Sequence, residues 1–525
     1  MVVNKLNWFL LSIILIMVVV TSLPYIYASG FSNTELNFGG FLFNPIDGNS
    51  YLAKMRQGWE GNLRFTLPYT AEPGSGAFLF LFYLVLGHIS RFTGFTLLTT
   101  FHAVRVICLI LMLLALYNFF KGLMRTERQL KIAYILSVFG SGLGWVAMLF
   151  GAFTADFWVA EAYPFLSAYS NPHFPLGLAL LLWIFSLSRR YLENDGFYGN
   201  NWYGIGFILG SILLGIVMPF GVVILVLVLG CLGMWESFEL FRLGKFQGKT
   251  SLAQKIYPTI LIGLGGGLIL LYYYWVTLND PVMAGWNSQN VTPSPPVWDF
   301  IVSFLPVLIF AIPGARIALR DRTKSMRILV VWSVLGFLLL WIPFGLQRRF
   351  IFGLYIPLAG LASLGIDKLL DSVRRYHNVI VISIIGFSII TNIVVIMAGI
   401  GGILSQDRSV YMTQGESQAF EWIDKNVQKD AVILASPDTG LLIPAYTGRR
   451  VLYGHPFETI DADTQMDIVN NYFNNPDSAG ASGLLTMVDY VFVGPREHEL
   501  SLNVIQFNLP VIYDEMGVTI YSVYR

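Results

Sequence analysis

Eleven apolar runs, each close to the length that crosses a bilayer, are the feature that most limits the fold of this chain. A helix needs about 20 apolar residues to span the hydrocarbon core of a membrane. A chain with many such runs folds as a bundle of spanning helices, because a helix satisfies its own backbone hydrogen bonds in lipid. The runs lie at 8–28, 99–120, 131–150, 172–188, 202–218, 219–238, 256–277, 298–318, 328–345, 350–368 and 378–404.

The composition agrees with a polytopic α-helical membrane protein of about eleven spans. Of the 525 residues, 55% are hydrophobic and 12% are charged, whereas soluble domains carry roughly 25% charge. Cys108 and Cys231 both lie in apolar runs, which argues against a disulfide framework and a cysteine-based metal site. The first run resembles a signal peptide, but its length of about 20 residues favours an uncleaved anchor.

The positions of lysine and arginine predict the orientation. With eleven spans and a cytoplasmic N-terminus, most cations fall in cytoplasmic segments, as the positive-inside rule requires. These cations are Lys5, Lys121, Arg125, Arg128, Lys131, Arg189, Arg190, Arg242, Lys245, Lys249, Lys255, Arg316, Arg320, Arg322, Lys324, Arg327, Lys368, Arg374 and Arg375. We therefore expect a multi-pass plasma-membrane protein whose C-terminal domain is extracytoplasmic.

One further apolar run, at 77–92, leaves an alternative open. It is short for a span, and we interpret it as an interfacial or re-entrant helix. In the alternative, the run at 77–92 spans the membrane and the N-terminus lies outside. The loops after this run then stay on the same sides of the membrane, and only the loop that carries Asp47 moves to the cytoplasm. Counting charges does not separate these two topologies.

The composition changes near residue 405. We expect residues 1–404 to form the membrane domain, with an external loop at 29–98, and residues 405–525 to form an extracytoplasmic α/β domain. In this last part, apolar residues at helical spacing predict a helix at 417–427. Runs rich in β-branched and aromatic residues predict strands at 431–435, 451–453, 490–493 and 518–524.

The polar segment 44–76 follows the first span and is the most informative loop. Its middle predicts a short amphipathic helix, a type that lies in a membrane interface. Asp47 stands just before that helix. One face would carry Tyr51, Leu52, Met55 and Trp59, and the other would carry Lys54, Arg56, Gln57 and Glu60.

Charged side chains gather in the segments that we assign to the outer face. A carboxylate there can take a proton from a hydroxyl or hold a metal ion, and a guanidinium can grip a phosphate through two hydrogen bonds. The candidates are Asp47, Glu60, Glu72, Asp156, Glu161, His173, Asp280, Arg348 and Arg349.

Each candidate also has a structural interpretation. Asp47 or Ser50 could cap the helix that follows. Arg348 and Arg349 could be interfacial arginines that extend toward lipid headgroups. Asp156 and Glu161 are five positions apart, a weak spacing for a metal site, and His173 fits the start of a span.

The order of these parts resembles the GT-C superfamily of integral-membrane glycosyltransferases, which includes protein O-mannosyltransferases, aminoarabinose transferases and the oligosaccharyltransferase catalytic subunit. The resemblance rests on an acidic residue ahead of "YLAKMRQGWEG", on "TAEPGSGAFLFLFYLVLGHISRFTG" leading through "HAVRV" to the next span, and on the late "QRRFIFGLYIPLAGLASL". It covers most of residues 1–405. The tail, with "ILASPDTGLLIPAYTGRRVLYGHPFET", is similar to the external domains that follow many such membrane modules.

The resemblance implies an inverting transfer of a sugar from a polyprenyl-phosphate-linked donor, within the bilayer, to a glycan, lipid or protein acceptor outside the cell, with no nucleic-acid partner. Asp47 would be the general base on the acceptor hydroxyl. Arg348 or Arg349 would hold the lipid phosphate. The remaining candidates for substrate binding are Lys54, Arg56, Glu72, Asp156, Glu161 and His173.

The cofactor and two competing functions stay open at this point. No residue is assigned to a metal, although a divalent cation such as Mg²⁺ or Mn²⁺ would suit the carboxylates. Many members of the superfamily have a second acidic residue where this chain has Gly48, so a non-catalytic relative that binds a cell-surface polymer or a partner is one alternative. A transporter of a lipid-linked substrate is the other, but it would place ionisable residues within the spans, and here they gather at the ends.

Overall fold

The computed structural model describes residues 8–193, 202–243, 249–321, 324–474, 481–500 and 507–523. Of the expected inner cations, Lys5, Lys245 and Arg322 lie outside these residues. The chain divides into two compact units. The first comprises residues 1–22, 104–272 and 292–398, and the second comprises residues 23–103, 273–291 and 399–525.

The first unit is helical. Four of its helices also have residues in the second unit: α1 (Trp8–Gly30), α4 (Leu97–Leu123), α11 (Lys249–Asn279) and α17 (His377–Leu404). The others are α5 (Glu127–Phe139), α6 (Gly144–Met148), α7 (Pro164–Ser170), α8 (His173–Glu193), α9 (Trp202–Val217), α10 (Pro219–Arg242), α13 (Val297–Phe304), α14 (Val307–Arg320), α15 (Arg327–Leu339) and α16 (Tyr355–Ser372). Short 3-10 helices are η1 (Ala155–Phe157), η2 (Ala160–Ala162), η3 (Gln347–Ile351) and η4 (Arg374–Tyr376).

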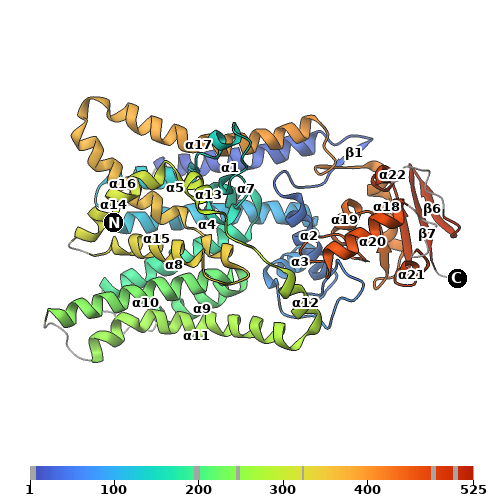
Figure 1. Cartoon of the computed structure of the whole chain (residues 1–525), viewed down its shortest axis with the longest axis horizontal. Coiled ribbons are helices and arrows are strands. Elements are labelled where there is room, and N and C mark those ends of the chain that lie inside the picture. The colour runs from blue at the N-terminus through green and yellow to red at the C-terminus, as the bar shows by residue number, and fades with distance from the viewer. Residues whose placement is uncertain are drawn as a thin grey trace. The chain divides into compact units, whose positions relative to one another are not determined.

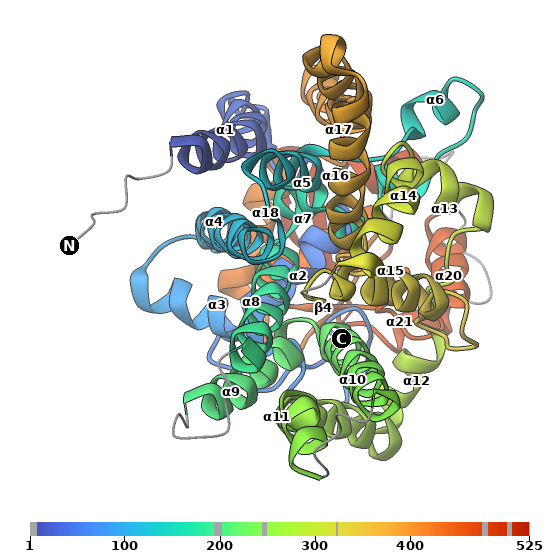
Figure 2. The ribbon, with the colours of Figure 1, turned by 90° about the vertical axis from the view of Figure 1, so that its left-hand side faces the viewer.

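Helix α16 forms the centre of this unit and lies among α5, α14 and α15 (Figure 2). Small residues allow its close approach to α14. A Cβ on Gly314 would lie 1.8 Å from the backbone oxygen of Leu361, and one on Gly365 would lie 2.2 Å from that of Phe310. Close backbone contact of this kind is typical of helix packing in membranes, where small residues replace the hydrophobic drive of soluble cores.

Each of the eleven predicted runs contains a helix. Among the described residues, seven helices are long and apolar enough to cross a membrane, and α13 with α14, bent by 82°, makes an eighth if the pair is one span. The remaining predicted runs correspond to the shorter α9 and α15 and to α8. The prediction of a multi-pass helical membrane protein is confirmed.

The second unit combines helices with two sheets. Its helices are α2 (Pro45–Trp59), α3 (Leu81–Thr93), α12 (Pro281–Gln289), α18 (Gln414–Asn426), α19 (Pro437–Thr447), α20 (Ala462–Asn474), α21 (Ala481–Leu485) and α22 (Pro495–Leu500). Strands β1 (Leu36–Phe38) and β2 (Tyr411–Thr413) pair antiparallel, with Leu36 opposite Thr413 and Phe38 opposite Tyr411.

The larger sheet has the order β4-β3-β5-β7-β6 and belongs to the part of the chain drawn in orange to red in Figure 1. Its first three strands are parallel and its last two pair antiparallel. The strands are β3 (Val432–Leu434), β4 (Arg450–Val451), β5 (Tyr490–Val493), β6 (Val511–Glu515) and β7 (Val518–Ser522). The predicted C-terminal α/β fold is confirmed, while β6, α19 and α20 were not predicted.

Candidate active site

Asp47 lies inside the first turn of α2, not ahead of it as we predicted. Asn44 is the N-cap and Pro45 is the first helical residue, a position that proline favours. The Asn44 side chain accepts a hydrogen bond from the Asp47 backbone N–H at 3.3 Å and donates one to Asp47 Oδ2 at 2.6 Å. This reciprocal cap explains the early start of the helix, and it means that neither Asp47 nor Ser50 is the N-cap.

The sequence predicts α2 as an interfacial helix with a cationic face, and in the structure that face is buried in protein. The Lys54 side chain is 0% exposed, and Arg56 and Gln57 are also buried. On one side α2 packs against α3, where a Cβ on Gly87 would lie 1.9 Å from the Met55 backbone oxygen. Helix α19 packs against it as well. The pattern that suggested an interfacial helix therefore reflects contacts with two other protein segments.

Lys54 and Glu458 form a buried ion pair within this unit. Lys54 Nζ lies 2.6 Å from Glu458 Oε1 and 2.5 Å from Ser50 Oγ, which itself donates to Glu458. Burial alone would raise the pKa of Glu458, but the charge of Lys54 and the hydrogen bonds from Lys54 and Ser50 outweigh it, so the pKa lies below its ordinary value. Lys54 is thus committed to the fold rather than to a substrate.

His455 faces Asp47 from the C-terminal part of the same unit. Its Nε2 lies 3.8 Å from Asp47 Oδ1, and the imidazole side chain is 3% exposed. Its Nδ1 accepts hydrogen bonds from the backbone N–H groups of Phe457 and Glu458, at 3.1 and 3.2 Å. The Asp47 side chain is 37% exposed, so a molecule in solution can reach this carboxylate.

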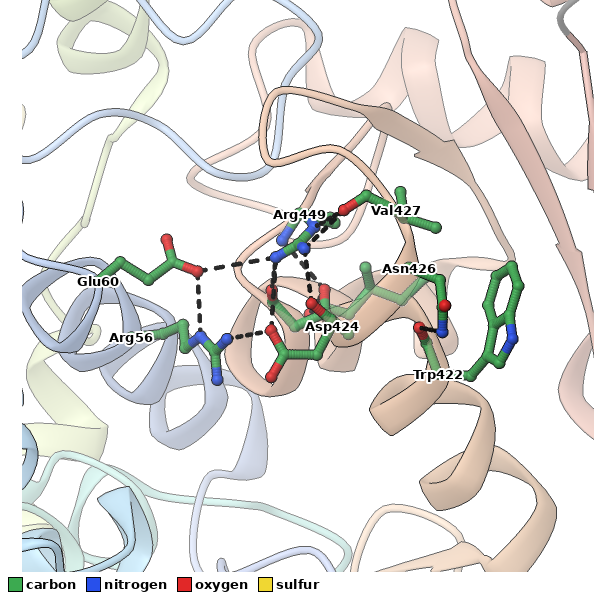
Figure 3. A network of polar contacts seen from close by, with 9 residues as sticks. Arg56, Glu60, Trp422, Asp424, Asn426, Val427 and Arg449 are labelled. Carbon is green, nitrogen blue, oxygen red and sulfur yellow. Dashed lines mark hydrogen bonds and ion pairs between the residues drawn. The ribbon is translucent and has the colours of Figure 1, made fainter.

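A second network holds the C-terminal end of α2 (Figure 3). Arg56 pairs with Asp424 on α18 and with Glu60, the latter at 3.3 Å. Arg449 Nη1 lies 3.5 Å from Asp424 and 3.8 Å from Glu60. Arg56, which we predicted to bind substrate, is therefore shared between two carboxylates. Glu72, by contrast, is exposed on the segment before α3.

In the first unit, Asp156 is 0% exposed. Its oxygens accept hydrogen bonds from the Gly144 backbone N–H at 2.9 Å and from Thr154 Oγ at 2.7 Å. Ser303 joins it to Asp299, donating to that carboxylate at 2.7 Å. Burial raises the pKa of Asp156 despite these hydrogen bonds. Because Asp156 is fully buried, a substrate could contact it only if the residues around it moved.

The late arginine pair lies beside Glu161. Arg349 Nη1 is 3.1 Å from Glu161 Oε1, and the Glu161 side chain is buried. The Arg348 guanidinium lies over the Trp158 ring, 4.7 Å from its centroid. His173 is the first residue of α8, half-buried, with its ring beside that of Phe174. Of the predicted candidates in this unit, the structure joins Glu161 directly to Arg349.

Sequence reasoning missed His455 and Glu458. Both lie in the run "HPFET", which belongs to the tail similar to external domains, but neither is near α2 in sequence. The signal that could have found them is chemical: the buried cation Lys54 requires a carboxylate partner, and few carboxylates of the tail lie in apolar surroundings. Asp299 and Ser303 were missed because they fall inside a predicted span.

The described residues do not fit a divalent cation. They contain no group of three or more histidine, cysteine, aspartate or glutamate side chains arranged for one. A histidine that binds metal through Nε2 carries a proton on Nδ1, whereas Nδ1 of His455 accepts two backbone N–H groups. The oxygens of Asp156 are likewise used by protein donors. The Mg²⁺ or Mn²⁺ that the sequence left open therefore has no supporting site among these residues.

Comparison with solved structures shows what this fold resembles. An oligosaccharyltransferase from Archaeoglobus fulgidus, in complex with Zn and sulfate, matches with a TM-score of 0.55 and 13% identity over 91% of this chain and 67% of its own. AglB from the same organism, in complex with an inhibitory peptide and a dolichol-phosphate, matches with a TM-score of 0.51 and 13% identity. The match covers 93% of this chain and 69% of the AglB chain. ArnT from Cupriavidus metallidurans, bound to undecaprenyl phosphate, matches with a TM-score of 0.50 and 10% identity over 97% and 98%.

The sequence itself gives no closer match. No protein-family model matches it, and no curated protein matches it. At 10–13% identity the likeness concerns the fold. It extends over more than nine-tenths of this chain and includes both the helical part and the C-terminal sheet region. The fold of this multi-pass membrane protein resembles the folds of these proteins, which belong to the GT-C superfamily of membrane glycosyltransferases, and such a fold is what the order of its sequence motifs predicted.

Proposed function

We propose that this protein is a membrane glycosyltransferase that moves a sugar from a polyprenyl-phosphate-linked donor to an acceptor outside the cell. The observation that carries the proposal is the GT-C fold, present over 91% of the chain in the match to the archaeal oligosaccharyltransferase. Two of the similar proteins were solved with a polyprenyl phosphate, a dolichol-phosphate in one and undecaprenyl phosphate in the other. A lipid-linked donor is the substrate class that suits these likenesses.

Asp47 is the general base of the proposed reaction. It is partly exposed, and it sits in the first turn of a helix, where the helix dipole favours a negative charge. An ionised carboxylate at this point can take the proton of an acceptor hydroxyl as that oxygen attacks the anomeric carbon. Attack from the face opposite the phosphate inverts the configuration.

The leaving group needs charge stabilisation rather than a proton. A departing phosphate is a stable anion, so a second carboxyl group of the kind that glycosidases use is not required. Arg348 is our first candidate for the phosphate, because its guanidinium lies over the Trp158 ring, 4.7 Å from the ring centroid, and a guanidinium can bind a phosphate through two hydrogen bonds. A phosphate at Arg349 would have to compete with Glu161.

The proposed orientation has the N-terminus in the cytoplasm and the C-terminal domain outside the plasma membrane. The positive-inside rule supports the outer side of the C-terminal domain, since the cation-rich loops then face the cytoplasm. The acceptor is a glycan, lipid or protein on the outer side. A peptide bound to AglB makes a protein acceptor one reasonable choice for a first screen.

The test is a transfer assay on purified protein with a panel of synthetic polyprenyl-phosphate hexoses and pentoses. Turnover is measured as the release of polyprenyl phosphate. We expect Asp47→Asn to abolish turnover while the protein keeps its melting temperature. Asp438→Asn, an exchange in the first turn of α19, is the matched control and should retain activity. Full turnover by Asp47→Asn would refute the role of Asp47. Donor binding without turnover in the unaltered protein would favour the non-catalytic or transporter alternatives.

A further inference from the structure

The backbone around His455 fixes which nitrogen of its ring carries the proton. Nδ1 accepts hydrogen bonds from the backbone N–H groups of Phe457 and Glu458. An acceptor must present a lone pair, so Nδ1 is unprotonated. A neutral imidazole then carries its proton on Nε2. The two backbone N–H groups therefore select the tautomer of His455 that has its N–H bond at Nε2.

The protonated nitrogen faces Asp47. Nε2 is buried and has no hydrogen-bond partner among the residues that the structure describes. The nearest carboxylate oxygen is Asp47 Oδ1, 3.8 Å away. The other oxygen, Oδ2, already accepts from Asn44. A buried donor without a partner is costly, and here one short movement of a partly exposed carboxylate would satisfy it.

We propose that His455 is a positioning residue for Asp47: its Nε2–H donates to Asp47 Oδ1, while Asn44 donates to Oδ2, and together they aim the carboxylate. The proposal rests on the proposed function of Asp47 as the base. Catalytic hydrogen bonds are often long in a protein without substrate and shorten when the substrate binds. The distance of 3.8 Å fits such a contact before closure.

The role of His455 follows from its fixed tautomer. The acceptor O–H bond breaks and its proton moves to Asp47, while the acceptor oxygen bonds the anomeric carbon and the bond to phosphate breaks with its electron pair on the phosphate. His455 keeps its own proton throughout. Its donation stabilises the ionised form of Asp47 before the reaction and holds it in the attacking geometry, because a carboxylate has further lone pairs for the incoming proton.

Two other groups lie near the pair. Glu458, whose backbone N–H donates to His455 Nδ1, forms an ion pair of 2.6 Å with Lys54, and the Tyr69 ring lies 5.6 Å from the His455 ring. A substitution at residue 455 would remove the hydrogen bond that Nε2–H can donate to Asp47.

Two substitutions separate the positioning role from a purely structural one. His455→Asn keeps an acceptor for the two backbone N–H groups, as asparagine does in Asx turns, but its side chain is too short to reach Asp47. His455→Gln keeps an amide donor near the position of Nε2 and loses the local acceptor. We expect His455→Asn to keep the melting temperature and lose about tenfold or more in kcat, and His455→Gln to retain more kcat than His455→Asn. The reverse order would show that His455 only caps its turn and would overturn the proposal.

A second measurement needs no substrate. In protein with Cys108→Ala and Cys231→Ser, Asp47→Cys places a thiol where the carboxylate stood. Donation by His455 favours the thiolate, so adding His455→Asn should raise the pKa of that thiol by about one unit, read from the pH dependence of its alkylation rate. Equal thiol pKa values in the two proteins would refute the contact.

These results also separate this proposal from the proposed function. If Asp47→Asn retains transfer, the base is elsewhere and the proposed function of Asp47 fails, whatever the thiol titration shows. If Asp47→Asn is inactive but the thiol pKa does not respond to His455→Asn, the base stands and the role of His455 fails.

Discussion

Lys54 on α2 and Glu458 in the C-terminal segment form an ion pair of 2.6 Å in which the lysine side chain is fully buried. Removing one partner leaves an uncompensated charge in a buried site, which costs about 3–5 kcal/mol. We therefore expect Glu458→Gln and Lys54→Met each to lower the free energy of unfolding by that amount, measured by denaturant titration in detergent. Lys425→Met, which removes an exposed ion pair with Glu421, is the control and should change it by less than about 1 kcal/mol.

The same pair predicts a dependence of stability on acid. The pKa of Glu458 is lower in the folded protein than its ordinary value of about 4.3. The ionised Glu458 therefore makes its full contribution to the free energy of unfolding when the pH is above that ordinary pKa. The contribution is lost as the pH falls from there through the folded-state pKa. The difference in melting temperature between the natural protein and Glu458→Gln should be constant near neutral pH and shrink in acid. A difference that stays constant down to the acid limit of the fold would contradict this.

The contact between α2 and α3 predicts a strong effect of one methyl group. A Cβ on Gly87 would lie 1.9 Å from the Met55 backbone oxygen, so the helices must separate. We expect Gly87→Ala to destabilise the protein by about 1–3 kcal/mol or more. Gly263→Ala on α11 meets no atom within 4 Å and should be neutral or slightly stabilising, because alanine favours a helix. Equal melting temperatures for the two variants would show that α2 and α3 do not pack in this way.

The two arginines of η3 should differ in their effects. Arg348→Met removes the proposed phosphate contact and should weaken binding of undecaprenyl phosphate by about 10- to 100-fold, with little change in stability. Arg349→Met leaves the buried carboxylate of Glu161 without its cation and should chiefly lower stability. Adding Glu161→Gln to Arg349→Met should recover part of that loss. Calorimetric titration measures the affinity for undecaprenyl phosphate, and thermal unfolding of the same samples measures stability. An unchanged affinity in Arg348→Met would show that Arg348 does not bind the phosphate.

The proposed orientation can be tested with single cysteines in protein lacking Cys108 and Cys231. Asn49 is buried and unsuitable, whereas Glu72 and Lys429 are exposed. An impermeant thiol reagent should label Glu72→Cys and Lys429→Cys in intact cells. Arg190→Cys, exposed at the end of α8, should react only after lysis. Labelling of Glu72→Cys only after lysis would support the alternative in which residues 77–92 span the membrane.

The helices were predictable because each apolar run carries its own signal. A run such as 378–404 is apolar whatever surrounds it, and the cost of exposing its backbone in lipid dictates a helix. The surroundings of α2 were not predictable in this way. Lys54 finds its partner 404 positions later in the chain, so a cationic face that reads as exposed is in fact covered by distant protein.

The C-terminal elements also differ in how far their own sequences predict them. Strand β5 (Tyr490–Val493) is buried throughout, and its apolar run gave its bounds correctly. Strand β6 (Val511–Glu515) buries only Tyr513, and its apolar part, Val511–Tyr513, is too short to mark a strand by alternation. Helix α19 begins at Pro437 and contains Pro444, which mark loops when read locally. The contact of Asp47 with His455 depends on these elements, and so it could not be inferred from the first loop alone.

The pairing of β1 with β2 sets the order in which the first loop can be completed during synthesis. Asn37 in β1 donates a hydrogen bond to Gln414, which directly follows β2 and lies 377 positions further along the chain. At about 5–20 residues per second, a ribosome makes the second partner on the order of 20–75 s after the first. Throughout that interval Lys54 has no Glu458 and Asp47 has no His455. The surroundings of the proposed base are thus completed among the last events of biogenesis, and a chain that stops short of its tail would carry Asp47 without His455.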